Sequence, residues 1–330
     1  MTEENTAHPV PPLTQPPASV AASGWERATI EKLLMASLRE QQAARRWRWF
    51  GRLFWLALIG GAVWLALQSG QVTHQTASPH TAVVEISGEI AAESEASAEN
   101  VVSAVRQAFE DNGAQAVVLL INSPGGSPVQ AGIINDEIHR LKAMHGKKVY
   151  AVVEETCASA AYYIAAAADN IYVDKASLVG SIGVLMDGFG FTGLMDKLGI
   201  ERRLMTAGEN KAMLDPFSPQ DESQKAYIQS MLAEIHQQFI EVVRKGRGDR
   251  LENNPDIFSG LVWSGQQAVA LGLADGLGNL DYVAREVVQA EDIVDYTQRE
   301  PVGLRLAKQF GMSIGQGIWQ AASAAGVKLR

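Results

Sequence analysis

Three separate segments of the 330-residue chain carry groups that together could perform acyl transfer on a carbonyl substrate. Ser159 lies in C-A-S-A-A, after an apolar run and before an alanine-rich stretch, where its hydroxyl would stand at a helix N-terminus. Lys211 ends the tetrapeptide G-E-N-K, and the turn N-S-P-G-G covers 122–126. A serine needs a base to remove its proton, and a neutral lysine amine can do so. The glycines of the turn allow backbone N–H groups to approach an anion closely.

Each of these signals also has an ordinary structural explanation. Ser159 fits a helix N-cap, Lys211 fits a solvated surface charge, and the glycine pair fits a tight turn. The six histidines of the sequence lie in no triad motif, and no G-x-S-x-G elbow occurs. We expect the sole cysteine of the sequence, Cys157, to be a small buried side chain rather than a nucleophile. The sequence predicts neither a metal site nor an organic cofactor.

A lysine can act as a base only while its amine is neutral. An ordinary lysine has a pKa of about 10.4, which leaves about one amine in 2,500 neutral at pH 7. Burial disfavours the charged form and lowers the pKa of a lysine. We therefore expect apolar surroundings for Lys211, and the candidates nearby in sequence are Met205, Met213 and Leu214.

The elements that must position these residues alternate between strands and helices. Continuous apolar runs predict strands buried on both faces. The predicted strands are 81–86, 116–122, 148–153, 170–174 and 201–206. Helical patterns cover 98–110, a segment reaching about residue 142, 158–168, a long amphipathic stretch from Asp221 to Lys245, and parts of 265–290. This alternation indicates an α/β fold with mostly parallel strands.

An uncharged segment, LFWLALIGGAVWLAL at 53–67, precedes this pattern. With its flanks it forms a stretch at 47–68 that is long enough to span a bilayer. Five arginines lie just before the apolar segment: Arg39, Arg45, Arg46, Arg48 and Arg52. The positive-inside rule then predicts a single-pass protein of the bacterial inner membrane, with a cytoplasmic N-terminus and a periplasmic catalytic domain. A buried core helix is the alternative, and a cleaved signal peptide fits poorly because a long segment precedes the apolar one.

The predicted organisation has five parts. They are a partly disordered cytoplasmic segment at 1–46, a transmembrane anchor at 47–68, a linker at 69–81, a catalytic domain at 82–295 and a C-terminal tail at 296–330. The formal net charge of −9 implies no large basic face, so we expect no nucleic-acid partner.

Several motifs, taken in order, give the chain a family resemblance. They are N-S-P-G-G, A-S-A-A-Y-Y-I-A, V-G-S-I-G-V at 179–184, and G-E-N-K followed by D-P-F at 215–217. Together they resemble the signal peptide peptidase SppA family of serine proteases, in its short single-repeat form. The resemblance covers roughly residues 82–290.

The resemblance implies a role for each matching residue. Ser159 matches the nucleophile, Lys211 matches the general base, and Ser181 matches a serine that orients the lysine. The backbone N–H groups of Gly126 and Ala160 match the oxyanion donors. Many members have two glycines after the serine, where this chain has two alanines. Because the oxyanion contact uses the main chain, alanine need not abolish it.

The resemblance also implies a fold and partners. The implied fold is ClpP/crotonase-like, with stacked ββα units preceded by one transmembrane helix. The implied assembly is a ring-shaped homo-oligomer, with an octamer as the expected size, and the serine and lysine pair either within one protomer or between neighbours. The implied substrates are remnant signal peptides.

Other functions stay open at this point. A SohB-like protease with general quality-control substrates would share the mechanism, and a catalytically silent scaffold would share only the fold. Dinucleotide binding is another alternative, because the segment 188–193 fits G-x-G-x-x-G. The segment lacks a convincing long helix after it and an early position in a βαβ unit, so the match is weak. A thioester-type crotonase enzyme would explain neither the anchor nor the Ser–Lys pair.

Overall fold

The computed structural model describes residues 32, 35, 47, 49–61 and 78–299. The chain divides into two compact units, Met1–Ser69 and Gly70–Arg330. In the first unit, residues 49–61 form a helix. No helix within the described ranges is both long and apolar enough to cross a bilayer.

Several predictions fall wholly or partly outside the described residues. Residues 48 and 62–68 of the predicted anchor lie outside the described ranges, and so do residues 69–77 of the predicted linker. Almost all of the predicted cytoplasmic segment and the tail from residue 300 onward also lie outside. The anchor therefore stays a prediction.

A mainly parallel β-sheet forms the centre of the second unit. Its strands run β6–β5–β3–β2–β1–β8, while β4 pairs with β3 and with β7. The bounds are β1 (His80–Ser87), β2 (Ala114–Ser123), β3 (Lys148–Ala158), β4 (Asn170–Val173), β5 (Leu178–Gly180), β6 (Val262–Ser264), β7 (Gly276–Leu277) and β8 (Ile293–Asp295). Only the β5–β6 pair is antiparallel among these. The predicted α/β fold with mostly parallel strands is confirmed.

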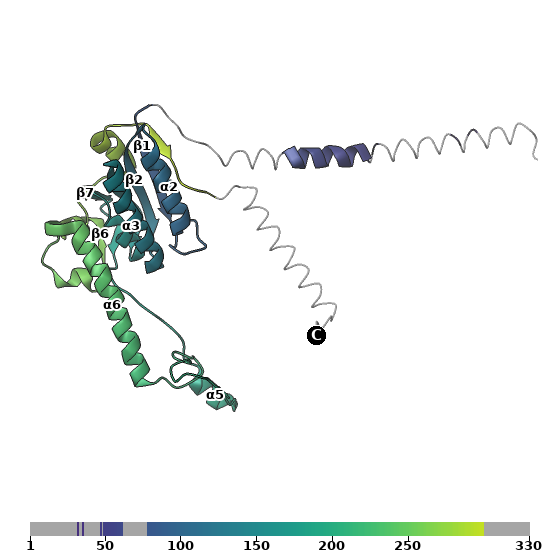
Figure 1. The fold of residues 1–330 in the computed structure, drawn as a ribbon, viewed down its shortest axis with the longest axis vertical. Coiled ribbons are helices and arrows are strands. Elements are labelled where there is room, and N and C mark those ends of the chain that lie inside the picture. The colour runs from purple at the N-terminus through teal and green to yellow at the C-terminus, as the bar shows by residue number, and fades with distance from the viewer. Residues whose placement is uncertain (1–31, 33–34, 36–46, 48, 62–77, 300–330) are drawn as a thin grey trace, which may run out of the picture. The chain divides into compact units, whose positions relative to one another are not determined.

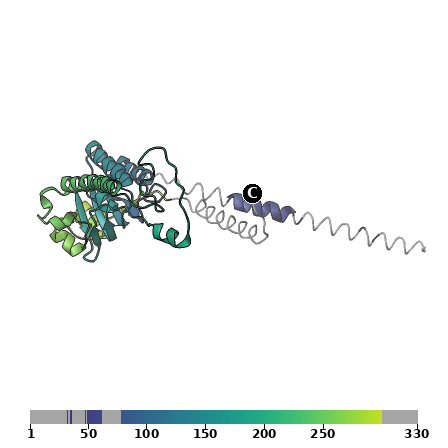
Figure 2. The same ribbon diagram turned by 90° about the horizontal axis from the view of Figure 1, so that it is seen from below.

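Helices α2 and α3 lie beside each other against the sheet, and α6 is the longest helix of the unit (Figures 1 and 2). The bounds are α2 (Ala98–Glu110), α3 (Pro128–His145), α4 (Ala160–Ala165), α5 (Thr192–Leu198), α6 (Glu222–Arg247), α7 (Gly265–Ala270) and α8 (Leu280–Tyr282), which continues as a π-helix over Val283–Val288. Capping side chains set several starts: Ser97 begins α2, Ser127 begins α3 and Asp221 begins α6.

The apolar runs of the central strands are explained by burial on both faces of the sheet. In β2, Val117 and Leu119 pack in the cluster shared with α2, α3 and α4, whereas Val118 packs in a smaller cluster on the other face with Val283. Successive strand residues point to opposite faces, so a strand covered on both sides is apolar throughout.

Strand β3 has two neighbours on one side. Residues 150–153 pair with β4, and residues 156–158 pair with β5. Both pairings are parallel, so the carboxyl ends of β3 and β5 lie side by side. The residues that immediately follow these two ends are Ser159 and Ser181.

Two of the predicted elements differ from the structure. Residues 201–206 form no strand, because no neighbouring strand pairs with them, and Met205 is 94% exposed. The predicted helix at 158–168 is shorter, since β3 continues to Ala158 and α4 covers only Ala160–Ala165. The remainder of the alanine-rich stretch is compact turn, with Ala166 and Ala168 buried.

A buried ion pair holds the C-terminal end of α6. The guanidinium of Arg247, 1% exposed, donates two hydrogen bonds to the carboxylate of Asp275, at 2.8 and 3.0 Å. Arg250 adds a third at 3.1 Å, and the N–H of Ile171 donates to the same carboxylate at 2.7 Å. Burial alone would raise the pKa of Asp275, but the hydrogen bond and charge of Arg247 outweigh it and lower that pKa.

Candidate active site

Ser159 occupies a sharp turn between β3 and α4. Its backbone angles are φ 53° and ψ −123°, a region that costs a non-glycine residue about 1–3 kcal/mol. The N–H of Ser159 donates to the carbonyl of Gly180 at 2.8 Å. The side chain makes no capping hydrogen bond to α4. The ordinary N-cap explanation therefore fails, and the turn has the strand-to-helix form that presents a nucleophile.

This elbow was hard to predict, because its usual G-x-S-x-G motif is absent. Small residues flank the serine instead: Cys157, Ala158, Ala160 and Ala161 are all buried. Burial raises the pKa of the Cys157 thiol, which keeps it protonated and supports the prediction that it is a buried hydrophobe rather than the nucleophile.

Gly125 is a site residue that the sequence analysis missed. A Cβ placed on Gly125 would lie 2.7 Å from the Cβ of Ser159 and 2.8 Å from the carbonyl oxygen of Ala158. Its φ of +105° also disfavours an L-residue. The Pro-Gly-Gly turn thus packs directly on the serine elbow. The signal was present in the first glycine of N-S-P-G-G, but spacing alone could not show which glycine touches Ser159.

We expect Gly125→Ala to destabilise the protein by about 2–4 kcal/mol, since overpacking and a left-handed φ act together. Urea unfolding of the full chain in detergent measures this change. Gly132→Ala is the matched control, because that glycine lies in α3 and a Cβ there meets nothing within 4 Å. Equal unfolding midpoints for the two variants would contradict the close approach.

Two backbone N–H groups beside Ser159 are available to a ligand. That of Ala160 belongs to the first residue of α4, where helical hydrogen bonding leaves N–H groups unused. Gly126 forms a β-bridge with Ile90, and the two hydrogen bonds of that bridge come from the N–H groups of Ile90 and Ser127. The N–H of Gly126 therefore takes part in neither of these two hydrogen bonds.

Ser181 lies next to Ser159 in the structure. Their preceding residues, Ala158 and Gly180, are direct partners in the β3–β5 register. Ser181 also has a positive φ, of 52°, and its N–H donates to the carbonyl of Leu261 at 2.8 Å. The fold therefore brings together Ser159, Ser181 and the glycine turn from three separate parts of the sequence.

Lys211 lies in a different part of the unit, which we call the arm and define as residues 184–220. The arm contains α5 and leads into the start of α6, where Figure 1 shows α5 away from the sheet. Lys211 is exposed within a run of turns, and no hydrogen bond among the described residues joins it to Ser159. Met205 and Leu214 are 94% and 48% exposed and Met213 is half-buried, so a single chain does not enclose the lysine in the apolar surroundings predicted for it. The pairing of Ser159 with Lys211 stays a prediction.

The arm exposes many large apolar side chains. They are Leu185, Met186, Phe189, Phe191, Leu194, Leu198, Ile200, Leu204, Met205, Leu214 and Phe217. Exposed apolar patches of this kind are more often interaction sites than ordinary solvent-exposed surface.

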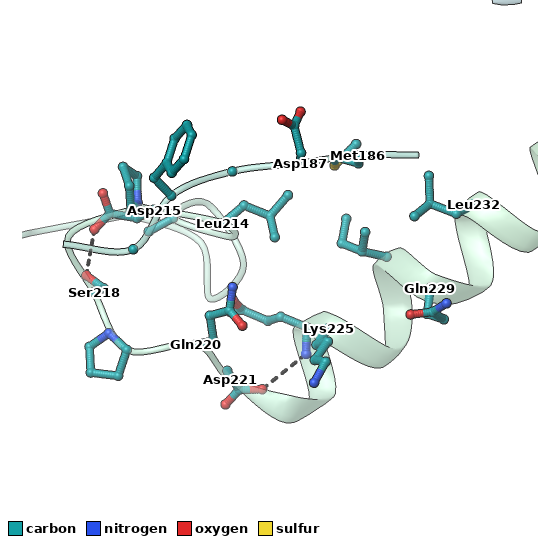
Figure 3. Close-up of a pocket in the computed structure, with 18 residues that line it drawn as sticks. Met186, Asp187, Leu214, Asp215, Ser218, Gln220, Asp221, Lys225, Gln229 and Leu232 are labelled. Carbon is teal, nitrogen blue, oxygen red and sulfur yellow. Dashed lines mark hydrogen bonds between the residues drawn. The ribbon is translucent and has the colours of Figure 1, made fainter. Parts of the chain in front are cut away.

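A cavity of about 290 Å³ lies between the arm and the first half of α6 (Figure 3). Figure 3 shows Met186 and Leu214 from the arm facing Leu232 from α6. Asp215 borders the cavity and accepts a hydrogen bond from the hydroxyl of Ser218 at 2.6 Å, which lowers the pKa of Asp215. No residue of the serine elbow lines this cavity.

The glycine motif at 188–193 lies in the arm. The last strand before it, β5, ends at Gly180, and extended coil separates the two. The helix after it, α5, has only seven residues. The motif therefore does not open a βαβ unit, which is the context that the dinucleotide-binding fingerprint requires.

Comparisons with known proteins find similarity to proteases. A model of "Peptidase family S49" matches residues 142–294, a range that contains Ser159, Ser181 and Lys211. The chain is 34% identical over 215 residues to the Methanocaldococcus jannaschii protein named "Putative protease MJ0651", which covers 63% of this chain and 68% of that protein. It is 29% identical over 199 residues to "Putative signal peptide peptidase SppA" of Enterococcus faecium, covering 60% and 58% of the two chains.

A third similarity is to a much longer protein. The chain is 48% identical over 176 residues to "Na(+)/H(+) antiporter NhaA" of Brucella melitensis biotype 1, covering 53% of this chain and 24% of that protein. The chain thus spans about a quarter of the length of the Brucella proteins that it matches.

Proposed function

Because the chain belongs to peptidase family S49, in which relatives named as SppA, SohB and Protease 4 occur, we propose that it is a serine endopeptidase with Ser159 as its nucleophile. The observation that carries the proposal is the strained elbow at Ser159. Its hydroxyl is not used for capping, and the glycine turn packs against it. A purely structural serine would have no need of this strain.

Lys211 is the proposed general base, delivered by a neighbouring copy of the chain. Two observations support delivery from outside. Lys211 is exposed on the arm, and the arm carries a large uncovered apolar surface that a second copy would bury. Burial of that surface would also desolvate the lysine and favour its neutral amine. The resemblance to SppA adds the expectation of a ClpP/crotonase-like ring, with an octamer as the expected size.

The proposed reaction is acyl transfer through a covalent intermediate. The Lys211 amine takes the proton of the Ser159 hydroxyl, and the serine oxygen attacks the peptide carbonyl. The N–H groups of Gly126 and Ala160 donate hydrogen bonds to the oxyanion, and such a donor contributes about 3 kcal/mol to lowering the barrier. The lysine then protonates the leaving amine, and water releases the acyl group from the serine.

The proposed substrates are remnant signal peptides and other apolar peptides. The supporting argument is the apolar segment at 53–67, which would hold the site beside a membrane, with the catalytic part on the periplasmic side of the inner membrane. Hydrophobic and small side chains should then be preferred around the cleaved bond. A SohB-like enzyme with general quality-control substrates is the alternative.

A fluorophosphonate probe tests the nucleophile directly. We expect the full chain in detergent to be labelled at Ser159 and to lose labelling in Ser159→Ala. Peptide mapping of the labelled protein identifies the modified residue. Absence of label in a folded wild-type preparation would instead support a catalytically silent scaffold. Cleavage of a peptide panel separates the substrate classes, since equal rates on charged and apolar peptides would favour the general quality-control function.

A further inference from the structure

One buried polar group beside the serine elbow has no partner. In the described part of the chain, the indole N–H of Trp263 is the one buried side-chain polar group without a hydrogen bond. Leaving such a donor unpaired costs about 1–3 kcal/mol, so each case in a folded protein needs an explanation.

The position of Trp263 supplies a candidate explanation. Trp263 lies in β6, the antiparallel neighbour of β5, and its ring packs on Gly180. A Cβ on Gly180 would lie 3.0 Å from Cδ1 of the ring and 3.6 Å from Nε1, so the nitrogen-bearing edge of the indole faces this glycine. Gly180 accepts the backbone hydrogen bond of Ser159 and directly precedes Ser181.

A second unpaired group is adjacent. The hydroxyl of Ser181 makes no hydrogen bond to any residue that the structure describes, although its backbone is fixed by the carbonyl of Leu261 at 2.8 Å. An indole N–H can only donate, whereas a serine hydroxyl accepts and donates at once. The two groups are therefore complementary, and Ser181 directly follows Gly180, the residue on which the indole ring packs.

We propose that Trp263 is a positioning residue for the peptidase reaction, whose indole N–H donates to the Ser181 hydroxyl in the assembled enzyme. This inference rests on the proposed function. The bond fixes the rotation of the hydroxyl and leaves the second lone pair of its oxygen free to accept an N–H of the neutral Lys211 amine, so that the lone pair of the amine stays directed at the Ser159 hydroxyl. Trp263 thereby orients the lysine through Ser181 without touching the substrate.

Trp263→Phe is the informative variant, because it keeps an aromatic ring against Gly180 while it removes the N–H donor. We expect kcat/KM on a fluorogenic apolar peptide to fall about three- to tenfold, the size of one neutral hydrogen bond. The loss should lie in kcat, with KM little changed, and the acid limb of the pH–rate profile should move to higher pH. The urea midpoint should not fall. Tyr172→Phe, which removes a hydroxyl from a half-buried aromatic ring on the other face of the sheet, serves as the control and should leave all these values unchanged.

A double-mutant cycle with Ser181→Ala tests whether Trp263 acts through Ser181. If Trp263 acts through Ser181, adding Trp263→Phe to Ser181→Ala changes kcat/KM by less than about twofold. An equal loss in both backgrounds, or no loss in either, overturns the inference. Failure of the proposed function would look different, because the wild-type protein would then neither cleave the peptide nor take up the fluorophosphonate label.

Discussion

A mixture of Ser159→Ala and Lys211→Ala copies should recover peptidase activity that neither variant shows alone. Each single variant should lose about a thousandfold or more in kcat, since nucleophile and base act as one unit. In a mixed ring, a working site forms wherever a copy with an intact serine receives the lysine of a copy with an intact arm. Random mixing in equal amounts then restores about a quarter of the wild-type sites. The measurement is peptide hydrolysis after joint unfolding and reassembly, or after co-expression of the two variants.

The mixing experiment separates the two ways in which the pair could form. Pairing within one protomer predicts no recovery at any mixing ratio. Lys197→Ala is the matched control, because Lys197 is an exposed lysine in the same arm and should be dispensable. Full activity of Lys211→Ala alone would refute its role as the base, and the fluorophosphonate result would still stand for Ser159.

Asp275→Asn should be the most destabilising of the isosteric substitutions outside the elbow. The change leaves the guanidinium of Arg247 buried without its counter-charge. Breaking a buried ion pair by removing one partner costs about 3–5 kcal/mol. Urea unfolding measures the loss, and Asp281→Asn, at an exposed position, is the control and should change the midpoint little. A comparable effect for the two variants would show that the ion pair adds no stability.

The stabilisation by Asp275 should also depend on pH in a defined direction. Its pKa in the folded protein lies below the ordinary value of about 3.9 that applies in the unfolded chain. The carboxylate therefore contributes its full stabilisation above that unfolded pKa and loses it as the pH falls through the lower folded pKa. The difference in unfolding free energy between wild type and Asp275→Asn should be constant near neutrality and shrink only in strong acid.

Much of the fold could be predicted because the central strands are buried on both faces. The runs at 116–122 and 148–153 contain little except apolar residues, and no other local pattern competes with that signal. The segment 201–206 misled the prediction, since a strand-like composition becomes a strand only when another edge pairs with it. The long helix from Asp221 was predictable from its cap and its amphipathic spacing.

The motifs predicted candidate residues of the site but not their geometry. Ser159 and Ser181 were candidates by motif, and the register of β3 with β5 explains why they are neighbours. The contact of Gly125 with Ser159 depends on which of two adjacent glycines the turn presents, which spacing does not determine. The surroundings of Lys211 could not be predicted from a single chain, because local apolar neighbours bury a residue only when something covers them.

The ion pair at the end of α6 has a consequence beyond folding. Helix α6 begins where the arm ends, and its other end is held by the hydrogen bonds of Arg247 to Asp275. The helix therefore carries the arm at the end that lies far from this ion pair. We expect the rigidity of the Arg247–Asp275 pair to limit how precisely the arm is oriented toward its binding partner.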